Sequence, residues 1–364
     1  MDFDIFRNKK IIVTGHTGFK GSWLVTWLRE LGADIVGIAL EPSTNPSHFE
    51  LLKLRNSIKN NFVDIRNNEK VKSIFEKEKP EFVFHLAAQP LVRYSYENPY
   101  ETWTTNTIGT ICILEALKNL KNDCTAIIIT SDKCYKNVEW TWGYRENDLL
   151  GGSDPYSASK GAAELAISSY FDSFFKSQLS NINICSVRAG NVVGGGDWAK
   201  DRIVPDAARA WINNNRLLIR NPSSTRPWQH VLEPLGGYLM LASSLYINKK
   251  LNGEAFNFGP KTNQNRTVQE VITKITTYWP ELEVEYQAKT FERSKESQLL
   301  KLCIDKALHL IGWAPLLDFE KTIKLTGEWF KEYKFNRANI SNFTRNQIRT
   351  YSDLLLSYEI NNGN

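Results

Sequence analysis

The first forty residues constrain the fold more than any other part of the chain. A β-branched run at 9–14 passes directly into the glycine-rich turn GHTGFKG at 15–21, and an apolar helical stretch and a second strand at 34–39 follow. Glycines in such a turn allow a pyrophosphate to approach closely, and the free N–H groups at the helix start favour its negative charge. Strand, turn and helix occur in the order that this motif requires. The sequence therefore predicts dinucleotide binding at Gly15, Thr17, Gly18, Phe19 and Gly21.

Predicted strands and helices alternate through the next 150 residues. This alternation implies parallel strands joined by right-handed helical crossovers, so the predicted fold class is α/β with a Rossmann-type doubly wound parallel sheet. Ligands bind such sheets beyond the carboxyl ends of the strands. The expected strands are 61–63, 82–86, 126–130 and 182–188, with helices beginning at Asn67, Tyr100 and Pro155, and polar segments follow the strand ends at 64–66, 85–89, 131–133 and 188–191.

The pattern changes after Asn191, where a glycine-rich stretch opens less regular sequence that is rich in Asn, Pro and aromatic residues. We expect a smaller, mixed α/β domain there, which binds the substrate. The expected division is a dinucleotide-binding domain at 1–190, to which 228–260 returns; a substrate domain at 191–227 and 261–340, with two helices and a short strand at 284–286 after residue 261; and a polar C-terminal tail at 341–364.

Composition narrows the class of partner. The 364 residues carry a net charge of +5 without a block of Lys and Arg, which suits anionic small molecules better than nucleic acid. Five cysteines without C-x-x-C spacing predict reduced thiols and no metal site. No signal peptide precedes the first strand and no apolar run is long enough to cross a bilayer, so we expect a cytoplasmic protein.

A second motif indicates redox chemistry on an alcohol. Tyr156 and Lys160 are four residues apart, so a helix places them on one face, where the ammonium would favour the phenolate and lower the Tyr156 pKa. Such a phenol can remove a hydroxyl proton. An isolated Tyr–Lys pair would more often be two solvated neighbours on a surface helix. This pair, however, follows Ser131 and the glycine turn in the same predicted sheet.

Together these motifs resemble the extended short-chain dehydrogenase/reductase superfamily. The strings VTGHTGFKGSWL, HLAAQPLVR, TSDKCY, GYRENDLLGG, DPYSASKG, VRAGNVVGGGDWAKDRIVPD and RPWQHVLEPLGGY are similar to those of the CDP-glucose 4,6-dehydratase family of O-antigen pathways. The resemblance implies NAD as cofactor and CDP-glucose as substrate, in a nucleotide-sugar-binding second domain. It also implies a cycle in which C4 is oxidised, water leaves across C5 and C6, and the hydride returns to C6. The transient C4 ketone acidifies the C5–H because the carbanion becomes an enolate.

The resemblance also implies roles for the catalytic residues. Tyr156 is expected to be the base for the C4 hydroxyl, Lys160 to bind the nicotinamide ribose, and Ser131 to hydrogen-bond the C4 oxygen. Asp132 matches the acid for the C6 hydroxyl, although a carboxylate at a strand end can simply cap a turn. Lys133 departs from the related dTDP-glucose enzymes, which carry glutamate there. Like-charge repulsion from Lys160 and the oxidised nicotinamide would favour its neutral form, so we expect it to be the C5 base or a cation that stabilises the enolate.

Further site residues follow from the same resemblance. For the diphosphate we expect Arg226, assisted by Arg202, because a guanidinium donates two parallel hydrogen bonds. Asn191 matches the residue that contacts the sugar-side phosphate. An acidic residue that normally ends the second strand is replaced by Ala39-Leu40, and no arginine there favours NADP, so the family resemblance decides for NAD. The other expected residues are Gln89, Arg93 and His230 for the substrate, Asp64 and Ile65 for adenine, Leu86, Ala87 and Ala88 for the cofactor, and Asn106, which orders the central helix through a buried water.

Two other functions share part of this pattern. A nucleotide-sugar 4-epimerase has the glycine turn and the Tyr–Lys pair but needs no acid/base pair for elimination, whereas Asp132 and Lys133 are present here. A catalytically idle dinucleotide-binding sensor or scaffold would normally lack Tyr156 or Lys160. We also expect a homodimer or homotetramer, because helices equivalent to those at Tyr100 and Pro155 usually pair across a dimer axis.

Overall fold

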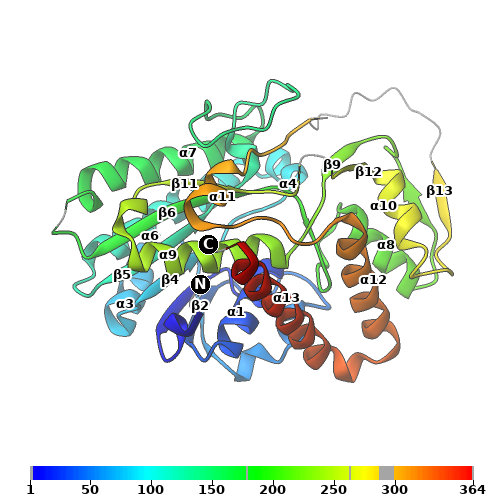
Figure 1. Cartoon of the computed structure of the whole chain (residues 1–364), viewed down its shortest axis with the longest axis horizontal. Helices are drawn as coiled ribbons and strands as arrows, with labels where there is room; N and C mark the ends of the chain where they lie inside the picture. Colours follow the sequence, from blue (N-terminus) through cyan, green and yellow to red (C-terminus); the bar gives the residue numbers. More distant parts are fainter. Residues whose placement is uncertain (1–2, 178, 262–263, 287–298, 363–364) are drawn as a thin grey trace.

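A seven-stranded parallel sheet forms the centre of the protein. The computed structural model describes residues 3–177, 179–261, 264–286 and 299–362 (Figure 1). The strand order is β11-β6-β5-β4-β1-β2-β3, so the direction of winding reverses beside β1. This confirms the predicted Rossmann-type sheet. Its strands are β1 (Lys10–Thr14), β2 (Asp34–Ala39), β3 (Lys59–Phe62), β4 (Phe82–His85), β5 (Cys124–Ile129), β6 (Ile182–Ala189) and β11 (Ala255–Phe258).

Successive residues of the central strands are buried on opposite faces of the sheet. In β1, Ile11 and Val13 belong to one hydrophobic cluster, and Ile12 belongs to another. Alternating side chains point to opposite faces, and both faces are covered by helices, which explains why the strands read as continuous apolar runs. The first face packs against α1 (Phe19–Glu30), α9 (Leu232–Ile247) and α13 (Ile340–Asn362), and the second against α3 (Asn68–Glu78), α6 (Gly109–Asn119) and α7 (Pro155–Tyr170).

One helix is longer and less regular than its neighbours. The helix expected from Tyr100 runs through α5 (Pro99–Trp103), a π-helical segment at Thr104–Ile108 and then α6. Helix α7 likewise continues into a π-helical segment, Phe171–Phe175.

No helix in the described part of the chain combines the length and the apolar character of a membrane span. All five cysteines are free and four of them are buried.

The region after Asn191 contains more helix than the sequence predicts. Before the expected tail, the described residues after 261 form three α-helices, not two, and α8 lies in the stretch expected to be irregular. The division into two domains stays a prediction, because one hydrophobic cluster contains both Val13 of the sheet and Trp279 of the proposed substrate domain. The elements are β7 (Val192–Val193), α8 (Ile203–Ile212), β8 (Leu217–Ile219), β9 (Thr225–Pro227), β10 (Gln229–His230), β12 (Asn265–Thr267), α10 (Val268–Ile275), β13 (Val284–Tyr286), α11 (Asp305–Ile311) and α12 (Phe319–Phe335).

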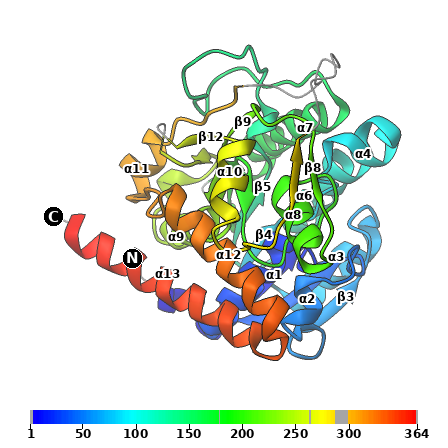
Figure 2. The same ribbon diagram turned by 90° about the vertical axis from the view of Figure 1, so that its right-hand side faces the viewer.

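The segment expected as a polar tail is helix α13, apart from residues 363–364, which lie outside the described part. Ile340, Ile348, Tyr351 and Leu355 recur at helical spacing and are buried, and α13 packs against α1, α9 and α12 (Figure 2). Its exposed face is polar, so the average composition of the segment conceals the buried stripe. The segment is therefore a helix packed against the rest of the protein and not the tail that we expected.

A buried carboxylate fastens α13 to the core. Glu233 accepts hydrogen bonds from the Tyr351 hydroxyl (2.8 Å) and from the backbone N–H groups of Leu316 (2.9 Å) and Leu317 (2.5 Å). Burial raises the pKa of Glu233 to about 7, although these hydrogen bonds oppose the shift.

Glu233 should therefore make unfolding pH-dependent. Because its pKa is higher in the folded state, its contribution to the free energy of unfolding is largest at low pH and is lost between about pH 4.5 and pH 7. The Glu233→Gln variant should lose about 3 kcal/mol of that pH dependence. Urea unfolding of both proteins at pH 5 and pH 7.5 measures the difference. Equal pH dependence in the two proteins would contradict a neutral Glu233.

Candidate active site

The glycine turn is pressed against the end of β4. Gly15 has a φ of +73°, and a Cβ there would lie 2.7 Å from the backbone nitrogen of Ala87. A side chain at Gly21 would clash with the carbonyl oxygen of Gly15. Helix α1 begins next. Its N-cap residue, Gly18, has no side chain to bond the free N–H groups, and the first turn of the helix contains no acidic residue. This turn leaves room and N–H groups for a pyrophosphate, so the residues fit a dinucleotide.

The expected adenine end consists of one ion pair and a close contact between the loop after β3 and helix α6. The Asp64 carboxylate accepts from the Arg66 guanidinium (2.6 Å), which lowers the Asp64 pKa. Ile65 is buried, and its side chain occupies the space that a Cβ on Gly109 of α6 would need. Beyond β2, the Thr17 hydroxyl donates to the carbonyl of Leu40 (2.9 Å).

Asn106 and Gln89 join three segments of the site by direct hydrogen bonds. The Asn106 amide bonds the backbone N–H of Gln89 (2.8 Å), the carbonyl of Gln89 (3.1 Å) and the Ser159 hydroxyl (2.9 Å). The water-mediated role that the resemblance implies for Asn106 stays a prediction. The Gln89 side chain in turn bonds Thr102 (2.8 Å) and both backbone groups of Leu91. Asn106 thus links the loop after β4 to α7, and the Gln89 side chain links the same loop to α5.

The expected catalytic residues Ser131, Asp132 and Lys133 lie in one tight turn after β5, and we call residues 131–134 the catalytic turn. The Ser131 hydroxyl accepts from the Lys133 backbone N–H (3.2 Å) and donates to the Asp132 carboxylate (3.0 Å). A Cβ on Gly190 would lie 3.2 Å from Asp132 Oδ2, so the carboxylate reaches the end of β6. Burial raises the Asp132 pKa, while Lys133, Ser131 and Lys20 oppose the shift.

Tyr156 and Lys160 are buried on α7, which begins beside this turn. Asp154 caps the helix by accepting from the Ser157 backbone N–H (2.9 Å). Burial raises the Tyr156 pKa to about 12, and a hydrogen bond with Ser131 and the charge of Arg202 lower it. Burial lowers the Lys160 pKa to about 8. The expectation that Lys160 lowers the Tyr156 pKa stays a prediction, and Ser131 and Arg202 are two groups that lower it in the structure.

Lys20 is a site residue that the sequence prediction missed. Burial lowers its pKa to about 8, and the positive charges of Arg202 and Lys160 act in the same direction, while Asp132 opposes them. Lys20 therefore lies among the expected catalytic residues. One signal was available in the sequence, because a cation in the first turn of a helix opposes the helix dipole. Arg202 is held by an ion pair with the buried Asp197 (2.9 Å).

The remaining expected substrate residues differ in their position and in their exposure to solvent. Arg226 lies in β9, directly opposite Arg266 of β12, and the neighbouring Pro227 packs at 3.9 Å from the position of a Cβ on Gly190. Asn191 directly follows Gly190. Arg93 is exposed and paired with Asp201 (3.0 Å). The His230 ring is fully buried against Trp23 and accepts from the Leu232 N–H (3.3 Å). That placement gives His230 a packing role and removes it from the groups that a substrate can reach.

A parallel sheet with a glycine turn after β1 and the Tyr156–Lys160 pair on α7 is the arrangement of the extended short-chain dehydrogenase/reductase superfamily. The chain belongs to the family described as GDP-mannose 4,6 dehydratase, whose family model matches residues 12–326. It is 46% identical over 336 residues to the CDP-glucose 4,6-dehydratase of Salmonella typhimurium, covering 92% of this chain and 93% of that protein.

Solved structures share the fold. An epimerase from Methanothermobacter thermautotrophicus superposes with a TM-score of 0.77 at 24% identity, covering 91% of this chain and 94% of the other. A dTDP-glucose 4,6-dehydratase from Bacillus anthracis in complex with NAD gives 0.72 at 21% identity, with 89% and 97% coverage.

The Asn106 bonds should be important for stability. The Asn106→Ala variant leaves the buried backbone N–H and carbonyl of Gln89 without their Asn106 partner and removes one hydrogen bond of Ser159, which should cost about 3 kcal/mol in the free energy of unfolding. Denaturant unfolding measures the change. Asn119→Ala on the same helix is the control, since its side chain donates to only one carbonyl, that of Glu115. A similar loss in both variants would argue against the proposed link to α7.

Proposed function

We propose that this protein is an NAD-dependent CDP-glucose 4,6-dehydratase, which converts CDP-D-glucose to CDP-4-keto-6-deoxy-D-glucose and water. One observation carries the proposal: in the catalytic turn the buried Asp132 lies with Ser131 beside Tyr156, and the half-buried Lys133 directly follows Asp132. An alcohol-oxidising pair and an acid/base pair for elimination are thus combined. The 46% identity to a protein of that name supports the nucleotide.

The residues that would hold NAD lie along the carboxyl edge of the sheet. The glycine turn and the start of α1 suit the pyrophosphate, Asp64 and Ile65 the adenine end, and Lys160 the nicotinamide ribose. Bound NAD supplies a reversible two-electron oxidant for C4. Discrimination against NADP is supported at the end of β2, where the Arg55 guanidinium is occupied by Glu41 (2.7 Å) and Glu50 (2.6 Å).

Tyr156 would accept the proton of the C4 hydroxyl while Ser131 holds the C4 oxygen. A phenol with a pKa of about 12 needs nearby positive charge to take this role at neutral pH. Arg202 lowers the Tyr156 pKa, and Lys20 and Lys160 add positive charge to the same site. Such an arrangement favours the phenolate at the moment of transfer.

Asp132 and Lys133 would divide the elimination between them. Asp132 is buried and its pKa is raised, so it can carry a proton and donate it to the departing C6 hydroxyl. Lys133 would remove the C5 proton or stabilise the enolate as a cation. Arg226, Arg202 and Asn191 would bind the diphosphate and the sugar-side phosphate, where guanidinium groups suit the charge.

We infer that the protein assembles through α5, α6 and α7. Tyr100, Trp103, Ile108 and Leu165 on these helices are exposed apolar side chains, and an exposed apolar surface of this kind suits pairing with a second copy. A cytoplasmic location also stays a prediction from the sequence.

The substrate assignment is tested by incubating the purified protein with NAD and, separately, CDP-glucose, dTDP-glucose or UDP-glucose. The 4-keto product is followed by its absorbance in alkali, and CDP-glucose should be converted at the highest kcat/KM. Sugar labelled with deuterium at C4 should give product with deuterium in its C6 methyl group. Selectivity for another nucleotide would overturn the CDP assignment, and deuterium elsewhere would overturn the reaction.

Lys133→Ala should stop product formation while reduction of NAD on adding CDP-glucose remains detectable, because oxidation at C4 does not need Lys133. Absorbance of the reduced nicotinamide and product assays separate the two half-reactions. Lys136→Ala is the control, since Lys136 is exposed three residues further on. A Lys133→Ala enzyme that forms product at the parent rate would eliminate both proposed roles of the lysine.

A further inference from the structure

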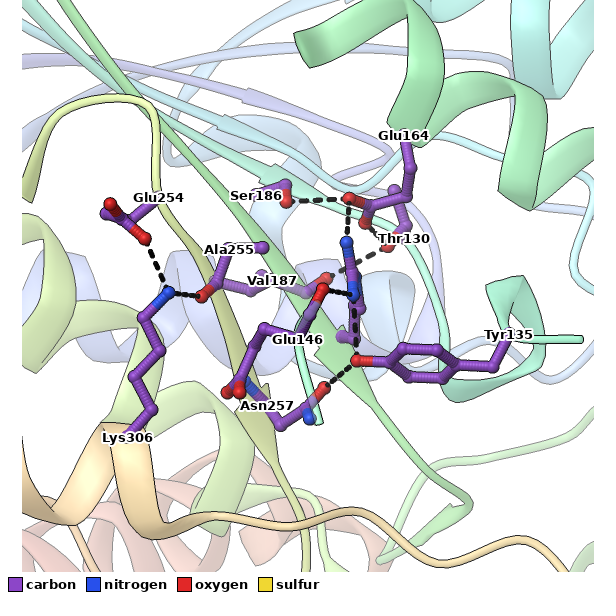
Figure 3. Close-up of polar contacts among 11 residues, drawn as sticks. Thr130, Tyr135, Glu146, Glu164, Ser186, Val187, Glu254, Ala255, Asn257 and Lys306 are labelled. Atoms are coloured by element: carbon purple, nitrogen blue, oxygen red, sulfur yellow. Dashed lines mark hydrogen bonds and ion pairs between the residues drawn. The ribbon is translucent and has the colours of Figure 1, made fainter. Parts of the chain in front are cut away.

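A buried ion pair lies directly beneath the catalytic turn. Glu164 is on α7, one helical turn after Lys160, and Arg188 is on β6, and their side chains are only 3% and 4% exposed. The Arg188 Nη2 to Glu164 Oε2 distance is 2.7 Å. Figure 3 labels Glu164, Ser186, Asn257 and Tyr135 of the polar network around this pair, which reaches β5, β6, β11 and the segment around Tyr135.

Each partner of the pair holds one end of the turn. Glu164 accepts from the hydroxyl of Thr130, the residue before Ser131, and from Ser186 (2.8 Å). Arg188 donates from Nη1 to the hydroxyl of Tyr135 (2.8 Å), the residue after Cys134 (Figure 3). The residues immediately before and after the catalytic turn are therefore tied to one ion pair.

The far end of the network is equally fixed. The Tyr135 hydroxyl donates to Asn257 Oδ1 of β11 (2.8 Å), and the Arg188 guanidinium lies 4.9 Å from the centroid of the Tyr135 ring. Arg188 also donates to the Glu146 carbonyl (2.8 Å). The Asn257 backbone N–H donates to the Glu146 carboxylate (2.9 Å). Tyr135 therefore has little freedom to move independently of β6 and β11.

Stability alone does not account for such a pair. Removing two charges from water is costly, and an apolar pair of similar volume is often as stable or more so. Arg188 Nε lacks a hydrogen-bond partner within the described residues, so the guanidinium is not fully satisfied. Fixed geometry is the property that a hydrogen-bonded ion pair supplies and an apolar pair does not.

We propose that the Glu164–Arg188 ion pair is a positioning device that holds both ends of the catalytic turn against α7, so that Ser131 and Asp132 meet Tyr156. The role rests on the proposed function, because it concerns alignment for that reaction. Glu164, Arg188, Thr130 and Tyr135 are positioning residues and need not touch the substrate.

The pair also has an electrostatic effect on Lys160. The negative charge of Glu164 raises the Lys160 pKa against the lowering caused by burial. Cys134, His85 and Lys20 also interact electrostatically with Lys160, and Tyr156 lies one helical turn before it on α7. Burial keeps the Cys134 thiol and the His85 ring neutral, because it raises the thiol pKa well above its ordinary value and lowers the His85 pKa to about 3. Glu164 is thus the carboxylate that favours the cationic form of Lys160.

Three variants test the positioning role by a measurement that does not depend on enzyme activity. Thr130→Val and Tyr135→Phe each remove one connection and keep the ion pair, and Glu164→Gln removes the charge but keeps a carbonyl acceptor. Amide hydrogen exchange of residues 131–136 should be roughly five-fold faster in each variant. Glu254→Gln is the control, because Glu254 forms a half-exposed pair with Lys306 (2.6 Å) in the same region without contacting the turn (Figure 3).

Kinetics supply the second measurement. With CDP-glucose and NAD, kcat should fall by up to about 100-fold in the three variants, because small displacements of catalytic groups are costly, while KM should stay close to the parent value. The alkaline limb of the pH–rate profile should move to lower pH in Glu164→Gln and stay in place in Thr130→Val.

The two proposals fail separately. Parent exchange rates in Thr130→Val and Tyr135→Phe, or parent kcat in both, would overturn the positioning role even if Glu164→Gln does not fold. A parent protein that converts no sugar nucleotide would overturn the proposed function, and the exchange rates would still decide whether the ion pair holds the turn.

Discussion

The parallel direction of β1, β4, β5 and β6 is the constraint on which the site depends. Because neighbouring strands point the same way, the segments that follow them meet at one edge of the sheet. Two close approaches show how crowded that edge is. A side chain at Gly15 would collide with Ala87, and one at Gly190 would press on the Asp132 carboxylate. Glycine at these positions is therefore a consequence of the topology, and the topology in turn decides which polar groups can meet.

Positive charge dominates this edge. The pKa values of Lys20 and Lys160 are both lowered to about 8 by burial, and the charges of Lys20's neighbours Arg202 and Lys160 add to the shift. Asp132 offsets part of this charge, and Asp197 pairs with Arg202 (2.9 Å). Such a group of cations is costly unless an anion joins it. A dinucleotide and a sugar nucleotide would each bring a diphosphate, so the electrostatics favour the same ligands as the glycine turn.

Residue patterns predicted the sheet well because its strands are buried on both faces and read as apolar runs; β2 was predicted at the same bounds as observed. The glycine turn and the Tyr156–Lys160 pair were predicted because local spacing defines them. Side-chain partners distant in sequence were beyond such reasoning. Asn106 bonds Ser159, Gln89 bonds Thr102, and His230 packs on Trp23, and local spacing predicts none of these contacts. Helix α13 was missed because its polar face outweighs a narrow buried stripe.

Two buried carboxylates show why position, more than burial, gives a residue its chemistry. Burial raises the pKa of both Asp132 and Glu233. Glu233 is surrounded by protein, with its oxygens used by Tyr351 and by two backbone N–H groups, and its proton can serve only stability. Asp132 lies in a turn whose hydroxyl neighbour Ser131 also hydrogen-bonds Tyr156. A proton held there is next to a group that handles a substrate oxygen, and the same desolvation that affects stability at Glu233 favours, at Asp132, the protonated form from which a proton can be donated.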